Sequence, residues 1–200
     1  MEAFLHGIIL AFGLILPLGV QNVFVFSQGA TQPNLLRALP ASVTAAICDT
    51  ILILLAVFGL SLIVLQFEWL RITLMTVGIL FLLYMGYAIW RSKPATAHNS
   101  DALPIKKQIL FALSVSLLNP HAILDTIGVI GTSALKYSGT EQMIFTIACV
   151  IISWLWFFGL TITGASFKKL DSSGKLMTIF TKCSAIFIWA TACYLVSGFL

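Results

Sequence analysis

The chain alternates between six long runs of apolar residues and short connections that contain charges, glycines and prolines. A helix needs about 20 apolar residues to cross the hydrocarbon core of a bilayer. It also satisfies its own backbone hydrogen bonds, which an open strand in lipid cannot do. The runs lie at about residues 3–27, 39–65, 72–90, 108–131, 143–167 and 176–199. The pattern therefore predicts an all-α integral membrane protein with six transmembrane helices.

The composition favours the same class. The 200 residues are 60% hydrophobic and 9% charged, whereas a soluble domain carries about 25% charged residues. We expect a single transmembrane domain over residues 1–200, surrounded by lipid. The net charge of +4 does not indicate a nucleic-acid partner, because the basic residues lie in short loops between apolar runs. The first run lacks a basic leader and a small-residue cleavage site, so we expect it to be retained as a helix.

The basic residues of the loops predict how the chain is oriented. Loops one, three and five hold most of them, namely Arg37; Arg91, Lys93, Lys106 and Lys107; and Lys168, Lys169 and Lys175. Loops two and four hold only Arg71 and Lys136, each balanced by a glutamate. Positive residues in short loops favour the cytoplasmic side of a membrane. The odd-numbered loops are therefore expected in the cytoplasm and both termini outside.

Two prolines indicate an internal repeat. Pro17 and Pro120 each lie near the middle of the first helix of a three-helix half, and Asn22 and Asp125 follow five residues later. Proline removes a backbone donor, so helices 1 and 4 are expected to be broken there. Because three crossings reverse the direction of entry, the two halves would be inverted repeats, which are typical of transporters. We expect repeat one at about 1–92, a linker at about 93–106 and repeat two at about 107–200.

Two aspartates lie deep inside apolar runs. Asp49 is about ten residues into the second run, and Asp125 lies in the fourth. A charged residue near the bilayer centre costs about 2.5–3.5 kcal/mol and usually marks a functional site. No lysine or arginine lies at comparable depth in the sequence. Each carboxylate would then be protonated, hydrated or neutralised by a cation from outside. The structural alternative is that each one accepts hydrogen bonds from backbone that a helix break frees.

Polar residues and a glycine surround both prolines. A break exposes the amide groups of the next half-helix, whose positive dipole end can hold a carboxylate. The candidate substrate contacts are the side chains of Gln21, Asn22, Asp49, Asn119 and Asp125 and the break regions at Pro17, Gly19 and Pro120. Gln21 and Asn22 can alternatively bond neighbouring helices. The candidates for proton coupling are Asp49, Asp125 and His121, and His121 can equally serve to fix the break.

Other kinds of chemistry find little support in the sequence. The four cysteines are Cys48, Cys149, Cys183 and Cys193. They form no CxxC pair and adjoin no proline, which argues against a thiol–disulfide carrier, and we expect them to be buried apolar side chains. No GxSxG, HExxH or P-loop occurs, so we expect no enzyme, metal or cofactor. Ser153 and its neighbours Trp154 and Trp156 are expected to shape a cavity or to pack. Gly7 and Ala11 can serve packing within the chain or a homo-oligomer.

The residues around both prolines resemble the motifs of a known family. Pro17-Leu18-Gly19-Val20-Gln21-Asn22, followed by Gln28-Gly29, resembles the first-helix motif of the LysE family of basic amino-acid exporters. Leu118-Asn119-Pro120-His121, followed by Leu124-Asp125-Thr126, is similar to its fourth-helix motif, and Asp49 resembles an aspartate of its second helix. The family pattern commonly has a second proline where this chain has Val20, so a gentler first break is expected.

The resemblance implies secondary export of L-lysine, L-arginine or both across the bacterial inner membrane. Relatives of this kind are energised by the membrane gradient, so coupling to the proton motive force is expected. A small-molecule amino acid is then the expected partner. The alternative within the wider superfamily is export of neutral amino acids or of a divalent cation such as cadmium. The choice between lysine and arginine, the coupling ion and the oligomeric state are left open.

Overall fold

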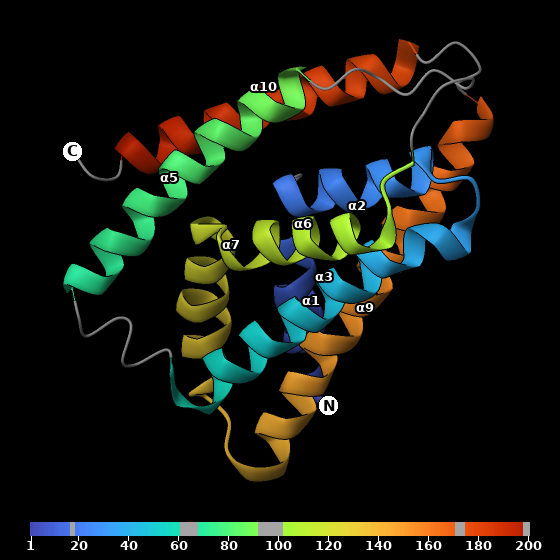
Figure 1. Ribbon diagram of the computed structural model, residues 1–200. Helices are drawn as coiled ribbons and strands as arrows, with labels where there is room; N and C mark the ends of the chain where they lie inside the picture. Colours follow the sequence, from blue (N-terminus) through green and yellow to red (C-terminus); the bar gives the residue numbers. More distant parts are fainter. Residues whose placement is uncertain (17–18, 61–67, 92–101, 171–174, 198–200) are drawn as a thin grey trace.

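The computed structural model describes residues 1–16, 19–60, 68–91, 102–170 and 175–197 (Figure 1). All regular structure in these ranges is helical, which confirms the predicted all-α class. The helices are α1 (Glu2–Ile15), α2 (Val20–Thr31), α3 (Leu35–Leu55), η1 (Ala56–Leu60), α5 (Glu68–Arg91), α6 (Ile105–Leu117), α7 (Pro120–Asp125), η2 (Thr126–Gly131), α8 (Thr132–Ala134), α9 (Gly139–Leu170) and α10 (Lys175–Ser197), where η marks π-helical turns.

Several of these helices are long and apolar enough to cross a membrane. The segments Leu35–Gly59 and Gly139–Phe167 meet this criterion on their own, with 25 and 29 residues. The pair α1 and α2 would count as a third span, bent by 80°. The described parts of α5 and α10 hold shorter apolar stretches, Ile79–Arg91 and Thr178–Cys193. The membrane character of the chain is therefore confirmed, and the count of six spans stays a prediction.

Helix α9 is the centre of the larger part of the molecule. It packs against α1, α2 and α3, and α3 in turn packs against α6. Small residues allow these close approaches: Gly29 of α2 lies against the backbone of Thr161, and Gly164 of α9 lies against the backbone of Phe26. The hydroxyls of Ser42 and Thr161 form a short hydrogen bond between α3 and α9. Phe157 is fully buried at the same crossing.

Helices α5 and α10 form a second, thinner layer. They run side by side along one edge of the molecule, apart from the helices around α9 (Figure 1). Gly86 of α5 leaves room for the indole of Trp189, which also stacks on Trp90 with ring centroids 5.7 Å apart. This pair reaches the rest of the described chain mainly through α7 and α2. Leu82 and Ile188 carry that contact, within a buried apolar cluster.

The first and fourth apolar runs are each interrupted. Helix α1 ends at Ile15 and α2 begins at Val20, with Gly19 as its N-cap. Pro17 lies outside the described residues. Helix α6 ends at Leu117, and α7 begins at Pro120 after the N-cap Asn119. Proline is tolerated as the first helical residue because its missing N–H would have no intrahelical partner there.

Some sequence-based boundaries and burial predictions were wrong. Helix α3 begins at Leu35 and not near residue 39, and it contains Pro40. Its start is set by Asn34, whose side-chain oxygen accepts a hydrogen bond from the Arg37 backbone N–H at 3.0 Å. Such N-caps satisfy a donor of the first turn and stabilise a helix by about 1 kcal/mol. The prediction that all four cysteines are buried holds for Cys48 and Cys149, whereas Cys183 and Cys193 are exposed.

Candidate substrate cavity

The two interruptions face each other across a cavity. A Cβ atom added to Gly19, at the start of α2, would lie 4.0 Å from the side-chain nitrogen of Asn119, at the start of α7. The cavity at this point has a volume of about 140 Å³. That is close to the roughly 150 Å³ that holds a benzene-sized molecule. Breaks far apart in the sequence thus supply two walls of one small-ligand space.

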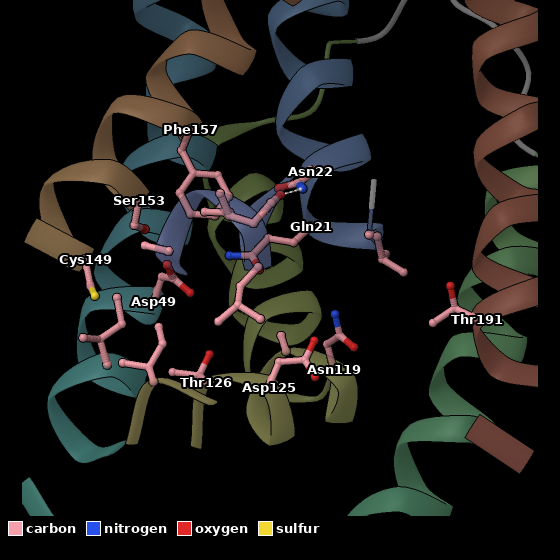
Figure 2. Close-up of a pocket in the computed structure, with 18 of the residues that line it drawn as sticks. Gln21, Asn22, Asp49, Asn119, Asp125, Thr126, Cys149, Ser153, Phe157 and Thr191 are labelled. Carbon is pink, nitrogen blue, oxygen red and sulfur yellow. Dashed lines mark hydrogen bonds between the residues drawn. The ribbon is translucent and has the colours of Figure 1, made fainter. Parts of the chain in front are cut away.

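Figure 2 shows the polar side chains of this cavity and the helices that carry them. They are Gln21 and Asn22 from α2, Asp49 from α3, Asn119 and Asp125 from the start and end of α7, Thr126 from η2, Ser153 from α9 and Thr191 from α10. Apolar residues complete the lining; they come from the same helices and also from α1 and α5. Five of these eight polar residues are the predicted side-chain contacts of the substrate, and the fold places all five on one cavity.

The two aspartates enter the cavity from different helices. Asp49 and Asp125 are both half-buried, because part of each side chain faces the open space. Behind Asp49, Ser42, Ala45 and Ala46 of the same helix are fully buried against α9. The described residues that line the cavity include no Lys, Arg or His. The lining therefore places two carboxyl groups in a largely apolar surrounding.

Three buried polar atoms on the cavity wall make no hydrogen bond of ordinary geometry with the described residues: Gln21 Nε2, Asn119 Oδ1 and Ser153 Oγ. The Ser153 hydroxyl nevertheless lies close enough to the Asp49 carboxyl to interact with it. Buried polar groups in proteins are nearly always satisfied, so each exception calls for a physical explanation. A bound polar ligand or water would supply the missing partners. The wall thus offers an amide donor, an amide acceptor and a hydroxyl that can act as either.

Asn22 has a different environment from the other polar residues. Its Nδ2 donates to the backbone carbonyl of Ile15, the last residue of α1, at 2.8 Å. Its Oδ1 accepts from the indole Nε1 of Trp156 at 3.3 Å. The nitrogen of the amide is therefore bonded across the break to α1, and its oxygen is bonded to α9. The geometry favours the alternative reading of Asn22, as a bond between helices.

The remaining predicted residues lie partly outside what the structure describes. Pro17 is not described, and the side chains of Pro120 and His121 are not described either. Gly19 lines the cavity as the N-cap of α2. Thr126 and Thr191 were missed by the sequence argument. Thr126 directly follows Asp125 and could have been included on that ground, whereas a single threonine in an apolar run such as that around Thr191 carries no signal.

Among the described residues, no group of three or more His, Cys, Asp or Glu side chains is arranged to hold a metal ion.

Interrupted apolar helices that meet at a charged cavity are characteristic of membrane transporters. The comparison with known sequences is specific. The sequence pattern described as LysE type translocator matches residues 12–198, and the chain belongs to this family. The family resemblance of the two motifs is thereby confirmed.

The chain is also similar over nearly its whole length to named proteins. It is 56% identical over 195 residues to YisU of Bacillus subtilis (strain 168), a protein provisionally named an amino-acid transporter; the match covers 97% of this chain and 89% of YisU. It is 30% identical over 198 residues to the arginine exporter protein ArgO of Enterobacter sp. (strain 638), covering 96% and 92% of the two chains. ArgO of Shigella flexneri is 31% identical over 195 residues, covering 94% and 90%. No solved structure matches the chain.

Proposed function

We propose that the protein is a secondary exporter of basic L-amino acids, lysine, arginine or both, in the bacterial inner membrane. The observation that carries this proposal is the placement of Asp49 and Asp125 on one small cavity whose described lining has no basic residue. A cationic substrate would neutralise carboxylates that are otherwise costly to hold in a membrane. Further support comes from the family and from relatives named as arginine exporters at 30% identity.

We also propose that the chain crosses the membrane six times as two inverted halves. The contacts between helices support this, because the main ones come in pairs. Helices α1 and α6 would be equivalent, as would α3 and α9; α1 packs on α9, and α6 packs on α3. Similarly, α2 contacts α10, and α7 contacts α5. The pairs α3–α9 and α5–α10 would each join two equivalent helices, as expected near a two-fold axis.

Transport would proceed by alternating access to the cavity between the two halves. Asp49 and Asp125 neutralise the positive groups of the substrate, and Gln21, Asn119 and the break regions hold its other polar atoms. An inside-negative potential of 100 mV opposes the exit of one positive charge by about 2.3 kcal/mol, roughly fiftyfold in concentration. Exchange of one proton for one cation cancels this electrical term. An aspartate that binds the proton and the substrate in turn provides such exchange, with His121 as a further candidate carrier.

The experiment is efflux of labelled amino acid from proteoliposomes under imposed pH and voltage gradients. Asp49→Asn and Asp125→Asn are each expected to reduce lysine and arginine efflux by at least about thirtyfold, because removing one partner of a buried charge pair costs about 2 kcal/mol or more. Glu141→Gln, which removes an exposed carboxylate at the start of α9, is the matched control and should retain efflux.

Unchanged efflux of both amino acids in both asparagine variants would refute the proposal. Parallel efflux assays with threonine and cadmium distinguish export of basic amino acids from export of neutral amino acids or of a divalent cation. Transport of threonine or cadmium in place of lysine and arginine would assign the cavity to that other substrate class.

A further inference from the structure

One side of the cavity wall offers hydrogen-bond donors and another side offers acceptors. This difference would orient a bound substrate. We propose that the first turn of α2, together with the Gln21 amide, binds the α-carboxylate of the substrate, while Asp49 and Asp125 take its two positively charged nitrogen groups. This inference rests on the proposed export of basic amino acids and adds the orientation in which they bind.

The donor side of the cavity is the start of α2. This helix has 12 residues, and its N-cap, Gly19, makes no side-chain capping hydrogen bond. The first turn of a helix leaves backbone N–H groups without intrahelical partners, and its dipole favours an anion there. Gly19, Val20 and Gln21 all line the cavity. An uncapped helix start thus opens onto the space where the substrate would lie.

Gln21 is the independent observation that points to a ligand at this place. Its side chain is only 8% exposed, and its Nε2 has no hydrogen-bond partner among the described residues. Figure 2 shows the amide nitrogen directed into the cavity, toward the side on which Asp49 lies. An amide –NH₂ group can donate two hydrogen bonds and accepts none. A buried donor of this kind needs an acceptor, and a carboxylate is the strongest one that an amino acid carries.

The second break differs from the first in the groups that it presents. Helix α7 has six residues and begins with Pro120, which has no N–H to donate,. The buried unsatisfied atom at its start is Asn119 Oδ1, an acceptor. Asp125 lies at the other end of α7 and also lines the cavity. In this proposal the start of α2 supplies donors to the cavity, whereas α7 supplies acceptors.

The charges of a basic amino acid match this division. Lysine carries an α-ammonium, a side-chain ammonium and one carboxylate, and the cavity presents two carboxylates and one group of donors. 1,5-Diaminopentane has the two ammonium groups of lysine and lacks only the carboxylate. It therefore isolates the contribution of the donor wall from that of the aspartates.

The test is competition by L-lysine and by 1,5-diaminopentane against labelled lysine in proteoliposomes that contain the full chain. Gln21→Met removes the amide and keeps the length of the side chain. It is expected to weaken lysine about ten- to hundredfold, the range for a lost hydrogen bond to a charged group, and to weaken the diamine far less. Gln21→Glu is expected to weaken the binding of lysine, because the new carboxylate repels the α-carboxylate of lysine. It is expected to strengthen the binding of the diamine, because the new carboxylate attracts an ammonium group.

Asp49→Asn provides the matched comparison and should weaken both ligands. If the Gln21 variants change both affinities in the same direction and to the same degree, or change neither, the carboxylate assignment is wrong. That result would indicate that Gln21 positions the Asp49 side chain and does not bind the substrate carboxylate. If Asp49→Asn and Asp125→Asn both leave the two ligands unaffected, the proposed function itself fails. The two failures are therefore distinguishable, and Gln21→Glu decides the orientation if Gln21→Met does not fold.

Discussion

Asn22 joins three parts of the chain at one point. Its amide donates to the carbonyl that ends α1, and it accepts from Trp156 of α9. Trp156 also packs edge-to-face on Phe12 of α1, with ring centroids 5.7 Å apart. The last carbonyls of a helix have no intrahelical donor, and the Asn22 amide supplies one to Ile15,. Asn22 and Trp156 thus fix the angle between α1 and α2, and with it the direction in which α2 opens onto the cavity.

Removing this contact should loosen the break. Asn22→Val and Trp156→Phe are each expected to lower the stability of the detergent-solubilised protein by about 1 kcal/mol, the usual contribution of a hydrogen bond between membrane helices. The double variant should cost less than the sum of the two, because both changes remove the same bond. Thermal unfolding followed by size-exclusion chromatography measures this.

Trp154→Phe is the control for the loss of an indole hydrogen bond elsewhere. Trp154 donates to Thr50 Oγ1 at 3.0 Å, between α9 and α3 and without contact to α1 or α2 through this bond. Its loss should lower stability to a similar degree and leave the affinity for substrate unchanged. Equal effects of all three single substitutions on affinity would contradict a positioning role for Asn22.

The sequence identified polar residues within apolar runs better than it identified the residues that they contact. Asp49, Asp125 and Asn119 were predicted at the site because a polar group in an apolar run needs a reason, and that reasoning uses only local sequence. The sequence offered a bond to a neighbouring helix as an alternative role for Asn22, but it could not name the partner, because Trp156 is 134 residues away. Ser153 was a cavity candidate on the same local ground, while Thr191 depended wholly on how α10 meets the rest of the chain.

At the scale of single helices, the packing of α2 on α9 depends on two glycines. A Cβ atom added to Gly164 would lie 3.0 Å from the backbone nitrogen of Ala30, and one added to Gly29 would lie 3.1 Å from the Cα of Thr161. Each would also meet a backbone carbonyl more closely still. Backbone cannot move aside as the end of a side chain can. Small residues at such crossings let membrane helices approach closely.

Alanine at these positions should separate the two helices. Gly29→Ala and Gly164→Ala are each expected to destabilise the protein by about 1–3 kcal/mol, the usual cost of overpacking, and to reduce transport by shifting α2. Gly159→Ala lies on the same helix α9 with nothing within 4 Å of the added atom. It should be neutral or stabilising, since alanine favours a helix by about 1 kcal/mol over glycine. The measurement is the thermal unfolding temperature of the three variants. An equal decrease in all three would contradict this account.

The apolar pattern predicted the presence of the helices, and local chemistry decided where they end. The second run was predicted to start near residue 39, yet α3 begins four residues earlier, at Leu35. The Asn34 cap was visible in the sequence and sets the start of the helix,. Pro40 lies inside the helix, where it removes one backbone hydrogen bond,. The interruption at Leu118 and Asn119 lies directly before Pro120, where the sequence predicted a break. The left-handed φ of 125° at Gly59 in η1 had no sequence signal beyond the glycine itself,.

At the scale of the whole molecule, the cavity lies where the α5–α10 layer meets the helices around α9. Leu82 of α5 and Phe187, Ile188 and Thr191 of α10 form one wall, and α2, α3 and α9 form the opposite side. A movement of α5 and α10 as a unit would change access to the cavity without disturbing the packing on α9. This arrangement suits the proposed alternating access.

The proposed orientation of the molecule can be tested by labelling from one side. In a chain whose four native cysteines are replaced, Lys136→Cys should react with a membrane-impermeant maleimide on intact cells, and Lys107→Cys should react only after the cells are opened. Both positions are exposed, so accessibility to the reagent depends on the side of the membrane. The reverse pattern would invert the orientation expected from the loop charges.

The central place of α9 has a consequence for how the protein is made. Helices α1 and α2 leave the ribosome first, yet their main partner begins at Gly139, more than a hundred residues later. During that interval the buried amides of Gln21, Asn22 and Gln28 have no α9 beside them. Synthesis delivers the N-terminal part of a chain before the partners that will cover it. Assembly around α9 is therefore a late event. If synthesis stops before α9, α1 and α2 remain in the bilayer with polar side chains uncovered, which quality-control proteases can recognise.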